Sequence, residues 1–243
     1  MRKILLCPVA YNENVKLKNA IERFLRGPAV ALVDYMIVDD ASTDGTTEMI
    51  KSYASRGVKT MKHASRMGVG AAIRTAIKYA ISNHYEIVVI MAGNDKDNPD
   101  EVPLLTEPIL KEGYDFIQGS RYVNGTRIGG DMPNYRKLAT KLHPLLFSLV
   151  TGRKVTDSTN GFRAIRLSIL QDKRFDIDQP WLNTYELEPY LLFKAIKLGY
   201  KFKEVSVTKI YPSRKLGYTK MRPIVGWWSI LKPIFYLGLG LKK

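Results

Sequence analysis

Acidic and amide side chains close three apolar runs in the first hundred residues. The pairs are Asn12-Glu13 after 2–9, Asp39-Asp40 after 33–38, and Asn94-Asp95 after 86–91. Carboxylate and amide oxygens accept hydrogen bonds from nucleobase N–H groups and from ribose hydroxyls. Open parallel sheets bind ligands at the carboxyl ends of their strands. If the three runs are strands of one sheet, the sequence predicts a nucleotide site where they end.

Some of these residues also have a plainer interpretation. Asn12 fits a helix cap, and Asp44-Gly45 fits a turn, so neither needs a ligand. Gly68 and Gly70 would admit a nucleotide closely, or would simply begin a helix. The adjacent acids Asp39 and Asp40 repel each other unless something uses them, which favours a binding role for that pair.

Strand and helix patterns alternate four times before residue 92, which predicts an α/β fold with a doubly wound, mostly parallel sheet. The early strands are expected at 2–9, 33–38, 58–61 and 86–91, and the helices at about 13–26, 46–53 and 69–81. Later strands are expected at 115–120, 162–165 and 202–210, and later helices at 138–150 and 188–198. With no internal repeat or low-complexity linker, the chain is expected to form a single domain.

The net charge of +15 is unevenly distributed along the chain. Residues 1–100 carry 14 basic and 11 acidic side chains, whereas residues 101–243 carry 24 and 12, so the second part holds +12 of the excess. Such a basic half favours a polyanionic partner, although a solvated basic face is the alternative. Aromatic residues among the lysines near 200–218 only faintly resemble a nucleic-acid surface, so no nucleic acid is expected as a partner.

Cys7 is the single cysteine, which excludes an intramolecular disulfide and a cysteine-based zinc site and fits a reducing compartment. The apolar run at 4–7 is too short for a signal peptide and is interpreted as the first strand. We therefore expect a cytoplasmic protein.

Several motifs, in this order and spacing, resemble family 2 glycosyltransferases with the GT-A fold, in the branch of dolichyl- or polyprenyl-phosphate hexose synthases. The resemblance covers roughly residues 3–222. Its motifs are Pro8 to Glu13, Val38 to Thr46, Gly68 to Ala72, Gly119 to Arg121, Asp157 to Arg163, Glu188, and Arg214 to Lys220.

The resemblance implies an inverting transfer of a hexose from a UDP- or GDP-sugar to a membrane-held dolichyl or undecaprenyl phosphate. It implies a GT-A, Rossmann-like domain at 1–222, with a nucleotide-sugar half at about 1–121 and an acceptor half at about 122–222. The residues implied for the nucleotide are Pro8, Tyr11, Glu13, Asp39, Asp40, Gly68 and Asn94.

The chain departs from the family where relatives carry an Asp-x-Asp pair that holds Mg²⁺ or Mn²⁺. Those two positions are Ala92 and Asn94 here. Hard divalent cations require anionic oxygens, so two interpretations stay open. Asn94 with Asp95 or Asp97 would hold a weakened metal, which we take as the expectation. Alternatively, the ammonium group of Lys96 would replace the cation on the diphosphate. A plain surface turn is the remaining interpretation.

The resemblance places an acceptor phosphate on Arg121, Arg136, Thr140 and Arg214, and it adds Lys220 and Glu188 to the catalytic residues. A guanidinium group can donate two parallel hydrogen bonds to two oxygens of one phosphate. A phosphate is already anionic at neutral pH and needs no general base, whereas a carbohydrate hydroxyl acceptor, the alternative, would need Glu188 or Asp157 as the base. The missing acids also leave an inactive transferase as an alternative.

Two apolar segments predict contact with an anionic membrane surface. One is the run at 138–150, and the other is the tail at 223–243, which contains Trp227, Trp228, Phe235 and Tyr236. The tail is broken by Lys232 and Pro233, while a spanning helix needs about twenty apolar residues. We therefore expect a peripheral protein on the cytoplasmic face. A membrane-anchoring partner, packing on the core and a homo-oligomer interface are the alternatives.

Overall fold

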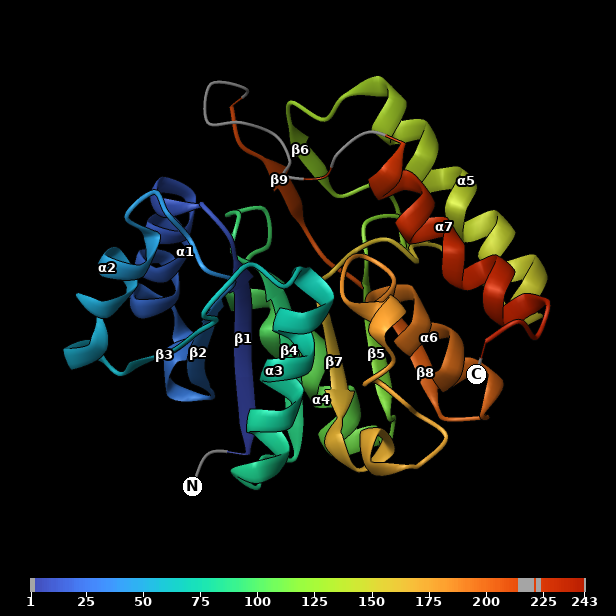
Figure 1. The fold of residues 1–243 in the computed structure, drawn as a ribbon, viewed down its shortest axis with the longest axis horizontal. Helices are drawn as coiled ribbons and strands as arrows, with labels where there is room; N and C mark the ends of the chain where they lie inside the picture. Colours follow the sequence, from blue (N-terminus) through green and yellow to red (C-terminus); the bar gives the residue numbers. More distant parts are fainter. Residues whose placement is uncertain (1–2, 214–220, 222–223, 243) are drawn as a thin grey trace.

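A computed structural model describes residues 3–213, 221 and 224–242 of the chain. Within these residues, seven strands form the central sheet. They are β1 (Ile4–Ala10), β2 (Asp34–Asp39), β3 (Val58–Lys62), β4 (Ile87–Ala92), β5 (Phe116–Ser120), β7 (Arg163–Arg166) and β8 (Phe202–Ser206). Their order is β3-β2-β1-β4-β7-β5-β8 (Figure 1). β7 is antiparallel to β4 and β5, and the other neighbours run parallel, so the predicted mostly parallel α/β sheet is confirmed.

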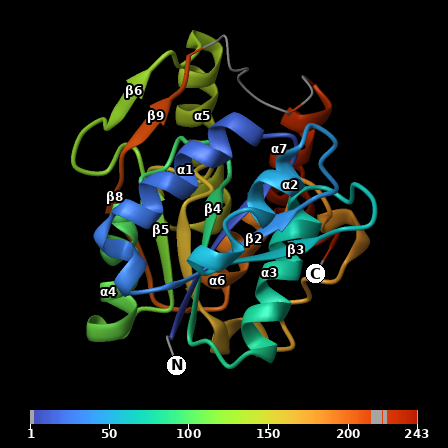
Figure 2. The same ribbon diagram turned by 90° about the vertical axis from the view of Figure 1, so that its left-hand side faces the viewer.

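Helices cover both faces of this sheet (Figures 1 and 2). On one face pack α1 (Asn14–Arg26), α2 (Thr46–Lys51) and α4 (Val102–Glu112). On the other lie α3 (Val69–Ser82), α5 (Asn134–Thr151), α6 (Leu187–Lys197) and α7 (Val225–Gly238). Alternate residues of β1 point into the two cores, because side chains of a strand alternate between faces. The sheet is therefore buried on both sides.

The formation of helix α3 is explained by the helical spacing of its small and branched apolar residues. Ile73, Ala76, Ile77 and Ala80 recur at helical intervals and are at most 1% exposed. Burying each isoleucine stabilises the fold by about 1.5–3 kcal/mol. Gly70, in the first turn, approaches the chain at 182–184 so closely that a Cβ there would lie 2.1 Å from the Leu182 carbonyl oxygen. This contact fixes the loop that precedes α6.

The prediction of one strand at 202–210 is wrong. β8 ends at Ser206, and β9 (Lys209–Tyr211) pairs with β6 (Ile128–Gly130) in a separate sheet. The chain turns between them because the Glu101 carboxylate accepts hydrogen bonds from the backbone N–H and the hydroxyl of Thr208, at 2.8 and 2.7 Å. This turn carries β9 away from the main sheet and over the carboxyl ends of its strands.

Two helices also differ from the expectations. α4 was not predicted, because Pro103 and Pro108 obscure its apolar face of Val102, Leu105 and Ile109. Pro103 lies in the first turn, where its missing N–H costs nothing. α5 begins at Asn134, four residues before the predicted start at 138, and Pro144 lies inside it.

α5 and α7 lie side by side and run in the same direction. Near their starts, the rings of Tyr135 and Trp227 are 6.1 Å apart. Near their ends, Gly238 lies against Val150, where an added Cβ would come within 2.5 Å of a valine methyl group. Within the described ranges, no helix combines the length and apolarity needed to cross a bilayer.

His143 joins these two helices to the loop after α5. Its Nε2 donates to the Ile230 carbonyl oxygen at 3.2 Å, so the neutral ring accepts from the Ser158 hydroxyl through Nδ1 at 2.6 Å. Burial lowers the pKa of His143 to about 4. Because protonation removes the Nδ1 acceptor, the contact requires the neutral imidazole.

We expect the free energy of unfolding to fall between pH 6.5 and pH 4, partly through His143. The unfolded chain takes up the proton near pH 6.5 and the folded chain only near pH 4, so acid favours unfolding by up to about 3 kcal/mol. Urea unfolding at several pH values should show a shallower decline for His143→Gln, whose amide can both donate and accept. An identical pH slope in the two proteins would contradict this role.

Candidate active site

Three polar loops meet where β1, β2 and β4 end. Ala10 pairs with Asp39, and Val9 pairs with Ala92, so the residues after these strands are neighbours. The loops are also joined directly. The backbone N–H of Thr43 donates to Asn12 Oδ1 at 2.7 Å, and that of Asn12 donates to the Ser42 hydroxyl at 2.9 Å. The predicted convergence of polar residues at one edge of the sheet is confirmed.

Asp39 and Asp40 are both buried, and their carboxylates accept hydrogen bonds from the chain itself. Asp39 accepts from the backbone and hydroxyl of Ser42 and from the Thr47 hydroxyl. Asp40 accepts from His63 and from the backbone N–H groups of Met67 and Gly68, each at 2.8 Å. The two acids therefore hold two loops in place, and direct contact with a nucleotide stays a prediction.

The remaining residues predicted for the nucleotide lie along the same edge. Gly68 has φ of +104°, and a Cβ there would meet the Asn183 carbonyl oxygen at 2.4 Å, so the chain itself requires glycine. Pro8 is buried inside β1. Tyr11 is partly exposed, and the Arg66 guanidinium lies 4.1 Å from its ring centroid. One face of the Tyr11 ring is therefore in contact with Arg66.

The acids predicted to hold a metal already face cations. Asp95 lies 3.0 Å from Arg23, and Asp97 lies 2.6 Å from Lys209. Asn94 Oδ1, Asp95 Oδ1 and Asp97 Oδ2 are buried and lack a hydrogen-bond partner within the described chain, although Asp95 and Asp97 belong to these ion pairs. Among the described residues, no group of three or more His, Cys, Asp or Glu side chains could hold a metal. Because a metal on a nucleotide diphosphate needs only one or two protein carboxylates, a metal held by this segment, or Lys96 in its place, stays a prediction.

Lys96 lies between the two acids in sequence but faces a different environment. Its side chain is buried, 5.1 Å from the Tyr211 ring centroid, and Arg136 approaches the same ring at 6.0 Å. Burial, together with the charges of Arg136, Lys209 and Lys16, lowers the pKa of Lys96 to about 7 against the opposing effect of Asp97. Positive charge is therefore concentrated beside Tyr211.

Tyr185 marks where the predicted donor and acceptor residues approach each other. Burial raises the pKa of its hydroxyl, Glu188 and Glu13 raise it further, and the charges of Arg66 and Arg136 oppose them. Charged side chains from four distant segments thus affect the pKa of the Tyr185 hydroxyl. Glu13 itself is ion-paired with Lys16 at 2.5 Å.

Arg121 and Asp157 form a buried ion pair beneath this region. The guanidinium donates two bonds to the carboxylate, at 2.6 and 2.7 Å, and further bonds to Thr159 and Tyr211. Burial alone would raise the pKa of Asp157, but the charge and hydrogen bonds of Arg121 lower it overall. The predicted contact of Arg121 with an acceptor phosphate stays a prediction.

The other acceptor residues are placed as follows. Arg136 and Thr140 lie one turn apart on α5, and the Thr140 hydroxyl shares a 2.6 Å hydrogen bond with Tyr122. Glu188 lies 3.5 Å from the buried Arg163, which also donates to the Glu188 carbonyl oxygen. Arg214 and Lys220 lie outside the described residues.

Four residues of this site were missed from the sequence: Lys16, Tyr185, Lys209 and Tyr211. Lys16 could have been found from its i,i+3 spacing to Glu13. Lys209 and Tyr211 carried no such signal, because β9 reaches the site through long-range pairing, with β6 about eighty residues earlier and with Asp97 after β4.

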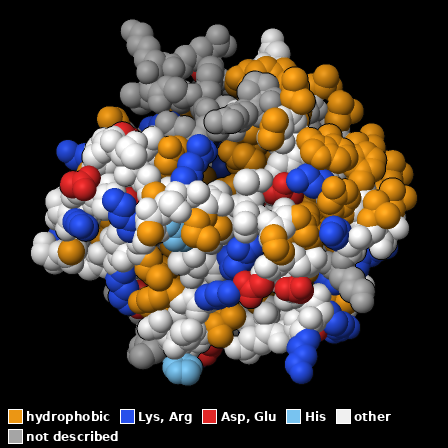
Figure 3. Space-filling view, viewed as in Figure 1, with side chains coloured by type: hydrophobic (Ala, Val, Ile, Leu, Met, Phe, Trp, Pro, Cys, Tyr) orange, Lys and Arg blue, Asp and Glu red, His pale blue; other side chains and the backbone are white. Residues whose placement is uncertain are grey.

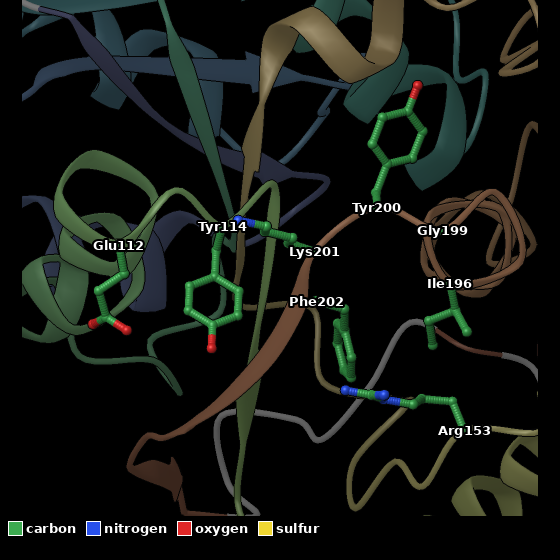
Figure 4. Close-up of a pocket in the computed structure, with 8 residues that line it drawn as sticks. All are labelled: Glu112, Tyr114, Arg153, Ile196, Gly199, Tyr200, Lys201 and Phe202. Atoms are coloured by element: carbon green, nitrogen blue, oxygen red, sulfur yellow. The ribbon is translucent and has the colours of Figure 1, made fainter.

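A separate hollow lies at the opposite end of the sheet, between α4, α6 and the start of β8 (Figure 4). Tyr114, Arg153, Tyr200 and Phe202 line it. Phe202 begins β8, so this hollow is remote from the carboxyl ends of the strands. None of the residues predicted for the donor or the acceptor lines it.

The sheet and its polar edge define an α/β enzyme of the kind that binds nucleotides at strand ends. Residues 7–173 match the model of glycosyl transferase family 2. The chain is 30% identical over 223 residues to undecaprenyl-phosphate mannosyltransferase of Micrococcus luteus, covering 91% of this chain and 88% of that protein. It is 28% identical to polyprenol monophosphomannose synthase of Mycolicibacterium smegmatis, covering 90% and 81%. The chain belongs to glycosyl transferase family 2 and is a glycosyltransferase, so the resemblance is confirmed.

Solved structures agree on the fold. Glucosyl-3-phosphoglycerate synthase from Mycobacterium tuberculosis, in complex with Mn²⁺, uridine diphosphate and phosphoglyceric acid, superposes with a TM-score of 0.69 at 19% identity, over 100% of this chain and 80% of that one. The same enzyme has been solved with Mg²⁺ and uridine diphosphate. The expected GT-A fold is confirmed.

We expect Asp157→Asn to destabilise the protein by about 3–5 kcal/mol, because it leaves the buried Arg121 guanidinium without its counter-charge. Urea unfolding measures this loss. Glu86→Gln is the matched control, since Glu86 pairs with Lys3 on the surface and its loss should cost under about 1 kcal/mol. Equal, small losses in both variants would contradict a structural role for the buried pair.

Proposed function

We propose that this enzyme transfers a hexose, with inversion, from a UDP- or GDP-sugar to the phosphate of a membrane-held polyprenyl chain. The observation that supports this most strongly is the concentration of cations beside Tyr211 and Tyr185, which fits an anionic acceptor and an anionic leaving group together. The relatives named above are, by their names, transferases to undecaprenyl phosphate and polyprenol phosphate.

The chemistry needs no general base on the protein. An acceptor phosphate oxygen attacks the anomeric carbon, the bond from that carbon to the diphosphate oxygen breaks, and the electron pair leaves with the nucleoside diphosphate. Arg136 on α5 would hold the acceptor phosphate through its guanidinium fork, and the donor would lie along the ends of β1, β2 and β4. Direct displacement from the opposite side inverts the anomeric centre.

A hydroxyl acceptor is less well supported, because both candidate bases are engaged. Asp157 is held by Arg121 at 2.6 Å, and its lowered pKa makes it a weak proton acceptor. Glu188 lies 3.5 Å from Arg163. An acceptor that is already anionic removes the need for either carboxylate.

An apolar surface supports attachment to a membrane. Figure 3 shows hydrophobic side chains gathered over α5 and α7. The exposed ones are Leu138, Leu142, Leu145, Leu146, Leu149, Trp227, Trp228 and Phe235. Tryptophan favours the bilayer interface, and neighbouring lysines and arginines would attract anionic headgroups. The 223–243 tail would therefore act as an interfacial segment, with the enzyme peripheral on the cytoplasmic face. Because α5 also carries Arg136, this surface would bring the acceptor phosphate to the site.

We expect Arg136→Ala and Arg214→Ala to keep donor affinity and to lose at least about tenfold in transfer, since each removes a phosphate contact worth at least 1.4 kcal/mol. The assay incubates UDP- and GDP-hexoses with polyprenyl phosphate and measures the sugar-lipid formed and the nucleotide released. Release that depends on a carbohydrate acceptor instead of the lipid phosphate would contradict the proposed function.

We expect a double change, Leu145→Glu with Leu149→Glu, to reduce sedimentation with anionic vesicles by about tenfold, because two carboxylates would enter the proposed interface. Leu104→Glu is the matched control, since Leu104 is similarly exposed but lies on α4, across the sheet. Equal vesicle binding by all three proteins would contradict the assigned surface.

A further inference from the structure

The segment 182–186, which precedes α6, lies between the start of α3 and helix α7 (Figure 1). On the α3 side, the backbone N–H of Ala71 donates to the Asn183 carbonyl oxygen at 3.0 Å. Arg74 Nη1 donates to the Asn183 side-chain oxygen at 2.8 Å. A Cβ at Gly68 would lie 2.4 Å from the Asn183 carbonyl oxygen, so the two backbones are in close contact. Movement of this segment would therefore displace the loop before α3.

The loop before α3 belongs to the donor edge of the site. The backbone N–H groups of Met67 and Gly68 both donate to the Asp40 carboxylate at 2.8 Å. Asp40 follows β2, and the nucleoside is proposed to lie along the end of that strand. The segment 182–186 therefore reaches the donor loops through a short chain of backbone contacts.

The other side of the segment is held by α7 through a buried ion pair and a hydroxyl group. Lys232 Nζ lies 2.7 Å from one carboxylate oxygen of Glu186, which is 3% exposed. The Thr184 hydroxyl donates to the other oxygen at 2.5 Å, so the Ser229 hydroxyl donates to Thr184 at 2.8 Å. Ser229 also accepts from the backbone N–H of Tyr185 at 3.2 Å. Two residues on one face of α7 thus hold the segment.

These polar contacts fix the position of α7 more closely than apolar packing would. A buried ion pair usually stabilises a fold no better than apolar side chains, because both charges lose their water. Its hydrogen bonds nevertheless require a particular placement of the two partners. The outer face of the same helix exposes Trp227, Trp228 and Phe235. One helix therefore contacts the active-site segment on its inner face and presents the proposed lipid-binding surface on its outer face.

We propose that α7 is a positioning element of the active site, and that binding of its outer face to an anionic lipid surface strengthens nucleotide binding. Lipid contact with the exposed indole rings favours the packed position of the helix, and that position holds the segment 182–186 against the donor loop. Lys232 and Ser229 are positioning residues, because they act through this segment. The inference rests on the proposed function, since it assumes a nucleotide-sugar donor and a membrane surface.

The test measures the affinity of UDP and GDP by isothermal titration calorimetry in excess Mg²⁺. Each titration is made without lipid and with saturating vesicles of phosphatidylglycerol and phosphatidylcholine. For the wild-type chain we expect the vesicles to raise nucleotide affinity by about fivefold or more. Coupling between two ligands is reciprocal, so the nucleotide should raise the affinity for vesicles, measured by sedimentation, by the same factor.

Matched variants separate this coupling from a loss of stability or of surface charge. Lys232→Met combined with Glu186→Gln removes the ion pair without leaving a lone buried charge, so vesicles should change its nucleotide affinity by less than about twofold. Lys232→Arg keeps the cation and should retain the enhancement. Lys141→Met is the control, because it removes an equal charge from an exposed position on α5, and it should also retain the enhancement. Ser229→Ala, which removes the hydroxyl alone, should reduce the enhancement.

The outcomes distinguish this inference from the proposed function. If the nucleotide and the vesicles both bind but neither affects the other, the role of α7 is overturned and the proposed function stands. Full enhancement in the double variant, or an equal loss in Lys141→Met, would also overturn that role. Absence of UDP and GDP binding would overturn the donor assignment as well, and absence of vesicle binding would overturn the assigned membrane surface as well.

Discussion

Compensation of buried charge at the carboxyl edge of the sheet is the constraint on which the site depends. Asp39 and Asp40 receive hydrogen bonds from their own loops, and Asp97 and Asp157 are neutralised by Lys209 and Arg121. Most of this negative charge is thus compensated within the chain, although Asp97 Oδ2 has no hydrogen-bond partner among the described residues. Lys96 and Arg136 both approach the Tyr211 ring, so this part of the edge suits an anionic ligand.

The topology explains how these groups reach one place. β1, β2 and β4 are parallel neighbours, so their polar loops open on the same side. The turn held by Glu101 sends β9 across that side, which carries Lys209 and Tyr211 from the basic half of the sequence toward the donor loops. α5 supplies Arg136 from its first turn and exposes leucines further along, so one helix would link the site with a membrane surface.

Much of the first half could be predicted from the sequence, because continuous apolar runs and helical spacing identify parallel strands and their helices. The run that ends at Met91, for example, is buried as expected. The acceptor half was less predictable. α4 was not predicted because two prolines interrupt its helical pattern. The break between β8 and β9 depends on a hydrogen bond between Glu101 and Thr208, which are 107 residues apart. The partners of the paired acids were also missed, because Ser42 and Thr47 resemble ordinary turn residues. The domain boundary at 222 stays a prediction.

The most direct test is a crystal structure of the protein with UDP or GDP and a short-chain polyprenyl phosphate. We expect the nucleoside along the loops after β1 and β2 and the acceptor phosphate on Arg136. A nucleotide bound elsewhere, for example in the hollow beside Phe202, would contradict the assigned donor site.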